Sequence, residues 1–165
     1  EATRDIIEKG ASLPPDDRGY PARMARALSM RHFEYFAIQE QRERLFRAWR
    51  EFFKGYDLVI SPIMPTVAYE HDHRGDGIPD MVSAYSLRTM TIDGKPHSYL
   101  DGLQWPSVAI VANLPATAVP TGRFIDGMPM GAQLMGPFLE DRTPLRFAQL
   151  VERELGGFAA PSACL

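Results

Sequence analysis

The sequence predicts a fold that contains both helices and strands, and three stretches carry this prediction. An amphipathic helical pattern runs from residue 21 to residue 54. A β-hairpin pattern lies near residues 114–136, and a shorter helical pattern follows at residues 145–155. The apolar residues of the helical stretches recur at three- and four-residue steps, which indicates helices with one apolar face.

The hairpin is predicted from two runs of small and apolar residues, Leu114–Gly122 and Met128–Gly136, on either side of Asp126-Gly127. Glycine accepts positive φ without strain, so an Asp-Gly pair between two apolar runs favours a tight turn. We therefore expect the two runs to pair as adjacent strands. Their small residues allow close backbone approach and predict strands that are buried on both faces.

The first third of the chain is predicted to be helical. Residues 1–11 suit a short helix that ends at Gly10, and Ser29 is a candidate cap where the longer pattern breaks into two helices. Gly55 occupies the position where a left-handed residue often ends a helix. We interpret the aromatic stripe of this region as helix core rather than as a ligand-binding box; it comprises Phe33, Phe36, Trp49, Phe52 and Phe53.

Shorter elements are predicted after residue 55. Residues 56–62 resemble a buried strand that ends at Pro62, and Asp93-Gly94 favours a second hairpin turn. Residues 99–113 suit a helix that is capped by Ser98 or Asp101, with Pro106 near its start.

The last helix is predicted to begin with Thr143 as its cap and Pro144 as its first helical residue. Its apolar stripe would then comprise Leu145, Ala148, Val151 and Leu155.

Composition bounds the function. The chain has 165 residues, about one domain, with 45% apolar and 24% charged residues and a net charge of −3. Basic residues form no run, so the sequence predicts neither a nucleic-acid partner nor a membrane surface. The single cysteine, Cys164, excludes a disulfide within the chain and fits the cytoplasm. The first residue is not Met, which suggests a processed end or a cut within a longer protein.

Metal and nucleophile chemistry are weakly indicated. His71 and His73 lie beside Asp72 and Asp76, in a spacing that two ligands of one metal ion can have. Because the sequence places no further ligand, we predict an exposed, metal-free loop at residues 70–80, with a metal site as the alternative. Cys164 is interpreted as a tail residue rather than a nucleophile, and no serine lies in a Gly-rich turn.

Two motifs resemble the C-terminal part of the amidase signature family. The first is N-L-P-A-T-x-V-P-T-G at residues 113–122, followed by D-G-x-P-x-G-x-Q-L-x-G-P at residues 126–137. The second is the stretch from Phe52 to Thr66, which contains Tyr56-Asp57 and S-P-x-x-P-T. The similarity covers roughly residues 45–158. It implies an α/β protein with a large mixed sheet and flanking helices, of which residues 1–165 form the C-terminal portion.

Within that portion, residues 1–55 are expected to be mainly helical, residues 56–142 to form strands and loops, and residues 143–158 to form the final helix. The family uses a Ser nucleophile, a second Ser in a cis peptide and a Lys base. This chain contains no matching Gly/Ser-rich motif, so no catalytic residue is assigned to it. The resemblance implies instead that this part completes the sheet and lines the substrate pocket, with candidates Tyr99, Gln104, Trp105 and Ser107.

The resemblance therefore implies part of an amide C–N hydrolase that acts on a small-molecule amide, without cofactor or metal. Unpaired strands near Val59 and Val119 are expected to associate with the N-terminal portion of the enzyme or with a second copy of the chain. Two alternatives stay open. One is a free-standing, non-catalytic binding domain derived from the same fold, and the other is metal-dependent hydrolysis at the His71/His73 loop.

Overall fold

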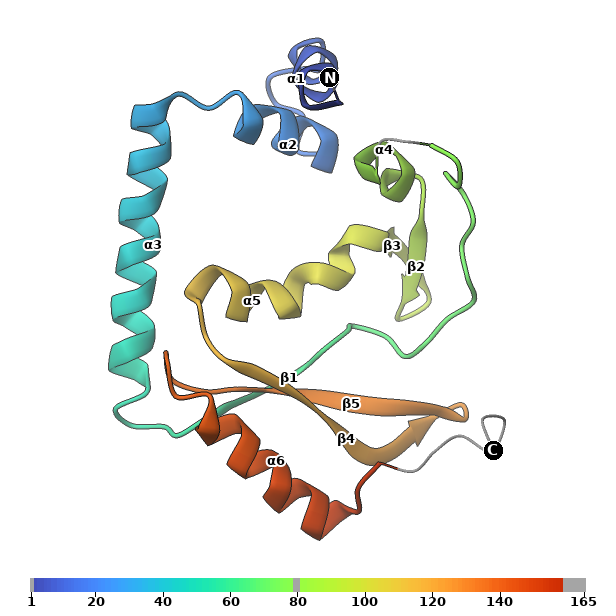
Figure 1. Ribbon diagram of the computed structural model, residues 1–165. Coiled ribbons are helices and arrows are strands. Elements are labelled where there is room, and N and C mark those ends of the chain that lie inside the picture. Colours follow the sequence, from blue (N-terminus) through green and yellow to red (C-terminus); the bar gives the residue numbers. More distant parts are fainter. Residues whose placement is uncertain (1, 79–80, 159–165) are drawn as a thin grey trace. The chain divides into compact units, whose positions relative to one another are not determined.

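The computed structural model describes residues 2–78 and 81–158, and the chain divides into two compact units (Figure 1). One unit comprises residues 1–41 and 70–102, and the other comprises residues 42–69 and 103–165. Within the described residues, no helix is both long and apolar enough to cross a membrane.

The first unit contains three helical segments from the start of the chain. Helix α1 spans Ala2–Ala11, α2 spans Tyr20–Leu28, and α3 spans His32–Phe52, passing from the first unit into the second. The predicted break at Ser29 is confirmed. Its hydroxyl donates a 2.8 Å hydrogen bond to the carbonyl of Ala25, so Ser29 closes the C-terminal end of α2.

The first unit also contains a short helix and a hairpin. Helix α4 spans Met81–Ser86, and strands β2 (Thr89–Ile92) and β3 (Lys95–Ser98) pair antiparallel before the 3₁₀ helix η1 (Tyr99–Leu103). Asp93 and Gly94 have φ of 49° and 74°, which confirms the predicted second hairpin turn.

The second unit is built on a three-stranded antiparallel sheet in the order β1-β5-β4. Strand β1 spans Val59–Pro62, β4 spans Ala116–Ile125, and β5 spans Met128–Met135. The predicted hairpin is confirmed, with φ of 50° at Asp126 and 79° at Gly127. Helices flanking antiparallel sheets also confirm the α/β fold class.

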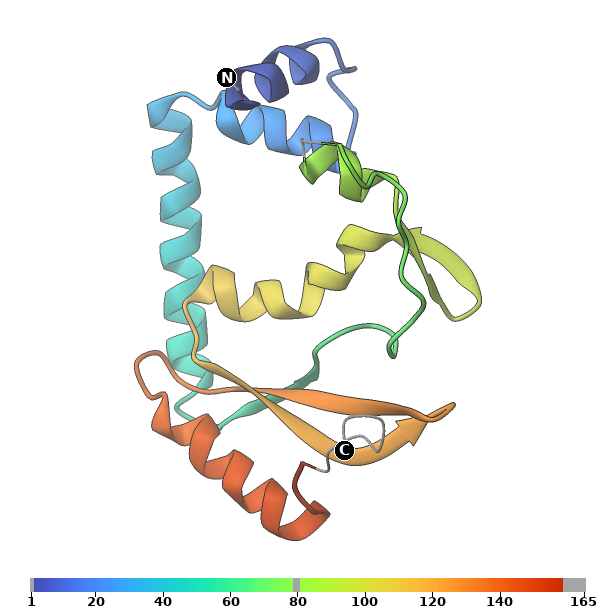
Figure 2. The same ribbon diagram turned by 45° about the vertical axis from the view of Figure 1, so that its right-hand side comes forward.

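Helices cover both faces of this sheet (Figure 1 and Figure 2). Helix α5 (Gln104–Ala112) lies over one face, and α6 (Arg142–Leu155) lies along β4 on the other. The main core forms between α5 and β5, where Ala109, Ala112, Leu114 and Met135 are buried. Trp49 and Phe53, at the end of α3, pack against this cluster. The predicted helical segment at residues 99–113 is confirmed for residues 99–112, which form η1 and α5.

The prediction of strands buried on both faces was wrong. In β4 only Val119 is buried, and in β1 Ile60 keeps 60% of its surface exposed. Both strands lie at edges of the described sheet, so each is covered less completely than the central strand β5, whose last three residues are all buried. Strand β1 also begins at Val59 rather than at Tyr56.

The predicted start of the last helix was also wrong. Helix α6 begins at Arg142, so Thr143 and Pro144 lie inside its first turn rather than at its cap. Proline is tolerated there because the first-turn N–H groups have no helical partner. The stripe that faces the sheet comprises Pro144, Phe147, Ala148 and Val151, whereas Leu145 and Leu155 are 53% and 58% exposed.

Most of the aromatic stripe of α3 does not form the helix core that was predicted for it. No residue of α3 is buried, and Phe33 and Phe36 are 62% and 57% exposed. Only the end of the stripe, at Trp49 and Phe53, packs against a core cluster. Gly55 follows the helix in a turn. Its φ is not positive, so it is not the left-handed cap that was expected.

Candidate functional site

An apolar groove of about 700 Å³ lies in the second unit between an extended segment and the hairpin. We call it the Trp105 groove. Its lining residues come from the segment after β1, from the start of α5 and from the turn end of the hairpin. They are Pro62, Ile63, Met64, Pro65, Thr66, Val67, Ala68, Tyr69, Trp105, Ile125, Pro129, Met130 and Gly131.

The extended segment forms one wall because the chain leaves the sheet at Pro62. Proline lacks an N–H for ladder pairing, and Pro62 and Pro65 keep the next residues out of the sheet. The segment passes close to β5 at Gly131, where an added Cβ would lie 3.3 Å from Ile63 Cδ1. None of the pocket residues predicted from the sequence lies in this segment, although its Pro-x-x-Pro spacing indicates a chain that leaves the sheet.

Trp105 forms the facing wall from the first turn of α5. The backbone there is tied to the sheet, because the buried Gln133 of β5 donates a hydrogen bond of 3.4 Å to the carbonyl of Trp105. Trp105 is 40% exposed and lines the groove. This placement brings one of the four sequence-derived candidates into a cavity.

The other candidates lie elsewhere. Gln104 precedes Trp105 on α5 and is exposed, and Ser107 donates its hydroxyl hydrogen to the carbonyl of Leu103 within the same helical turn. Tyr99 belongs to the first unit, where its ring lies 5.4 Å from that of Tyr85. None of these three lines the Trp105 groove.

The groove is suited to binding rather than to bond cleavage. None of its described lining residues carries a charge, so it offers neither a strong base nor an ion-pair partner. Its polar side-chain groups are the Thr66 and Tyr69 hydroxyls and the indole N–H of Trp105, and the rest of its side-chain surface is apolar. Such a surface favours an uncharged, apolar group, because an unpaired charge loses much hydration free energy on burial.

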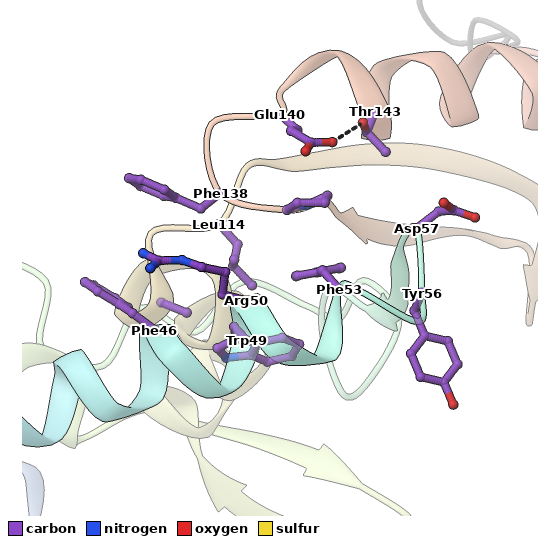
Figure 3. Close-up of a pocket in the computed structure, with 12 residues that line it drawn as sticks. Phe46, Trp49, Arg50, Phe53, Tyr56, Asp57, Leu114, Phe138, Glu140 and Thr143 are labelled. Carbon is purple, nitrogen blue, oxygen red and sulfur yellow. Dashed lines mark hydrogen bonds between the residues drawn. The ribbon is translucent and has the colours of Figure 1, made fainter.

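A second cavity, of about 370 Å³, lies elsewhere in the same unit (Figure 3). We call it the α3 cavity. The end of α3, the residues that follow it, the end of α5 and the loop before α6 contribute its walls. Its lining residues are Phe46, Trp49, Arg50, Phe53, Tyr56, Asp57, Ala112, Leu114, Pro137, Phe138, Glu140 and Thr143.

The His71/His73 loop belongs to the first unit and is exposed over residues 70–78 except at the partly covered Asp72 and Gly75, as predicted. Charged side chains of this loop form hydrogen bonds and ion pairs with one another. Arg74 donates several hydrogen bonds to Asp72, which lowers the pKa of that carboxyl, and His73 Nδ1 lies 2.8 Å from Asp76. Among the residues that the structure describes, no three His, Cys, Asp or Glu side chains are grouped to hold a metal ion. Cys164 lies outside the described residues.

Comparison with known proteins identifies the family. The family model described as Amidase matches residues 20–145, about three quarters of the chain. The chain therefore belongs to the amidase family, the amidase signature family that its hairpin motifs resemble.

Two relatives show the level of similarity. A glutamyl-tRNA(Gln) amidotransferase subunit of Lacticaseibacillus casei is 34% identical over 113 residues, which are 68% of this chain and 19% of that protein. The subunit of the same name from Rubrobacter xylanophilus is 31% identical over 132 residues, which are 79% of this chain and 24% of that protein. The chain thus spans about a fifth to a quarter of the length of these relatives.

The fold is shared with a solved enzyme of the family. A bacterial aryl acylamidase of the amidase signature family superposes with a TM-score of 0.62 at 18% sequence identity. The superposition covers 94% of this chain and 31% of the aryl acylamidase. At this identity the likeness establishes the fold.

Proposed function

We propose that this chain is the C-terminal part of an amide C–N hydrolase of the Ser-Ser-Lys type. In this proposal the Ser nucleophile, the second Ser and the Lys base belong to another part of the protein. The chain contributes sheet strands and one wall of the pocket for a small-molecule amide. Membership of the amidase family, together with the short span of the relatives that the chain matches, supports this division.

The Trp105 groove is the observation that carries the proposal. It is apolar, it lies between two segments that carry the family motifs, and its tryptophan is held on α5 by the bond from Gln133. A wall of this kind binds the non-reacting part of the substrate and excludes water from it. Binding energy gained there positions the amide carbonyl for attack by a serine on another segment.

The proposal is tested by comparing Trp105→Ala with Ile110→Ala in the protein as encoded in full. Ile110 lies on the same helix, is 69% exposed and does not line the groove. Loss of the indole contact removes roughly 1.5–3 kcal/mol of apolar burial, so we expect kcat/KM for an apolar amide to fall about 10-fold to 100-fold. The bond from Gln133 persists, because it uses the Trp105 carbonyl.

Acyl-enzyme trapping identifies the residue that acts as the nucleophile. An amide or carbamate that acylates the protein should label a serine outside residues 1–165. A label on a residue of this chain, or equal kinetics for Trp105→Ala and Ile110→Ala, would contradict the proposed division of roles.

The separated 165-residue chain is expected to show no amide hydrolysis, because acyl transfer without a positioned nucleophile loses most of its acceleration. It is also expected to associate. Strands β1 and β4 each pair on one side only in the described sheet, and unpaired edges favour pairing with another chain. We propose that these edges join strands from elsewhere in the protein or a second copy, in the cytoplasm.

Sedimentation of the separated chain measures this association. A stable monomer at high concentration, with no gain of activity on adding the rest of the enzyme, would favour the alternative of a non-catalytic binding domain.

A further inference from the structure

The α3 cavity has a preformed aromatic floor. The rings of Trp49 and Phe53 stack with centroids 5.7 Å apart and planes 27° apart. Both rings pack against the buried cluster that includes Leu114, which also lines the cavity. The floor is therefore held by the core of the unit. The volume of the α3 cavity, about 370 Å³, lies in the range of pockets for small ligands.

One wall of the cavity is held by a separate contact. Arg42 Nε donates a 2.9 Å hydrogen bond to the carbonyl of Val111, so the turn of α3 before the cavity is fastened to the last turn of α5. Ala112 and Leu114, which line the cavity beside this contact, are 2% and 8% exposed. The wall that contains Ala112 and Leu114 is therefore held by contacts within the unit.

Arg50 supplies a positive charge to the cavity lining. It lies on α3 beside Trp49, and its side chain extends toward the side of the cavity where Phe138 lies (Figure 3). Among the described residues, Arg50 makes no hydrogen bond and no ion pair. The planar guanidinium carries five N–H donors and matches the two oxygens of a carboxylate.

The acidic groups of the lining limit the charge that a ligand can carry. Glu140 accepts a 3.2 Å hydrogen bond from the Thr143 hydroxyl, so part of its acceptor capacity is used. Asp57 lies at the end of the cavity away from the Arg50 guanidinium (Figure 3). A second negative charge on a ligand would be repelled by these two carboxylates.

We propose that the α3 cavity is a binding site for a small aromatic monocarboxylate. The ring lies on the floor formed by Trp49 and Phe53, and the carboxylate accepts paired hydrogen bonds from the Arg50 guanidinium. This site is separate from the Trp105 groove and shares no lining residue with it. It does not depend on the hydrolase function proposed above.

Trp49 fluorescence provides a direct test with 3-phenylpropanoate as the probe. The experiment uses the protein as encoded in full, with Trp105→Phe and any other tryptophan replaced by phenylalanine, so that Trp49 is the reporter. We expect a saturable fluorescence change that weakens with added salt. Arg50→Met should raise Kd roughly 10-fold to 100-fold, the usual loss for a hydrogen bond to a charged group, and Arg50→Lys should raise it less.

Arg47→Met is the matched control, because Arg47 is an exposed arginine of the same helix that does not line the cavity. Its Kd should equal that of the parent protein. If Arg50→Met does not fold, as judged by circular dichroism, Phe138→Ala takes its place and should also weaken binding. Three results would overturn the proposal: no saturable change at millimolar 3-phenylpropanoate, equal affinity for the uncharged 3-phenyl-1-propanol, or tighter binding of 2-phenylethylamine.

Discussion

Arg42 of α3 donates a 2.6 Å hydrogen bond from Nη2 to the side-chain oxygen of Asn113, 71 positions away. Asn113 has φ of 51° and ends α5 in the left-handed conformation. The same guanidinium holds the Val111 carbonyl. One side chain of α3 therefore satisfies polar groups at the end of α5, where the helix has no internal partners for them.

We predict that Arg42 and Asn113 are energetically coupled. Arg42→Met and Asn113→Gly should each lower the free energy of unfolding by about 1 kcal/mol, and the double variant by less than the sum. Glycine is chosen because it keeps the positive φ without strain. Urea unfolding of the parent, the two single variants and the double variant measures this coupling. Arg44→Met, an exposed position on the same helix, should change stability by less than about 0.5 kcal/mol, and strict additivity would show that the contact is absent in solution.

Leu134 should be among the most sensitive positions of the second unit. It is 1% exposed in the central strand β5, so Leu134→Ala removes buried methyl groups and leaves a cavity. We expect a loss of roughly 2–5 kcal/mol in the free energy of unfolding. Leu145→Ala, at a 53% exposed position of α6, should cost less than about 0.5 kcal/mol. Equal losses at the two positions would instead support the sequence-based prediction that Leu145 belongs to the buried stripe of the last helix.

Asp72 should make the His71/His73 loop sensitive to acid. The side-chain hydrogen bonds from Arg74, then the backbone bonds from Arg74 and Thr89, lower the pKa of Asp72 in the folded protein. A lowered pKa stabilises the fold above the ordinary carboxyl pKa of about 3.9, and this contribution disappears as the pH falls through the folded-state pKa. Asp72→Asn should therefore be less stable than the parent at pH 7.

This difference between Asp72→Asn and the parent should shrink below about pH 3.9, where the aspartate protonates in the unfolded chain. Unfolding in denaturant across this pH range measures it. A difference that grows on acidification would contradict the lowered pKa.

The His71/His73 loop is predicted to bind no stoichiometric metal. Its acidic groups already accept hydrogen bonds from Arg74 and Arg88, which competes with coordination of a cation. Elemental analysis of the purified protein, with His71→Ala/His73→Ala as the control, measures this. A stoichiometric transition metal that disappears in the double variant would instead support metal chemistry at this loop.

Local chemistry was enough to predict several features from the sequence. Asp126-Gly127 and Asp93-Gly94 form hairpin turns because positive φ is a property of those residues and their neighbours. The break at Ser29 and the helix after residue 98 likewise depend on caps and proline rules that act within a few positions. The hairpin motifs were also sufficient to indicate the family that the comparison establishes.

Tertiary structure decided which apolar residues are covered and which of them form cavities. Periodicity groups residues on a stripe, but only a neighbouring element determines the stripe that is buried, so Phe147 and Ala148 face the sheet while Leu145 does not. Trp105 was a candidate from its place before the hairpin, yet its groove also requires Ile63 and Met130, which the chain brings together only by folding. Burial depends on contacts between distant segments, and a one-dimensional pattern does not contain them.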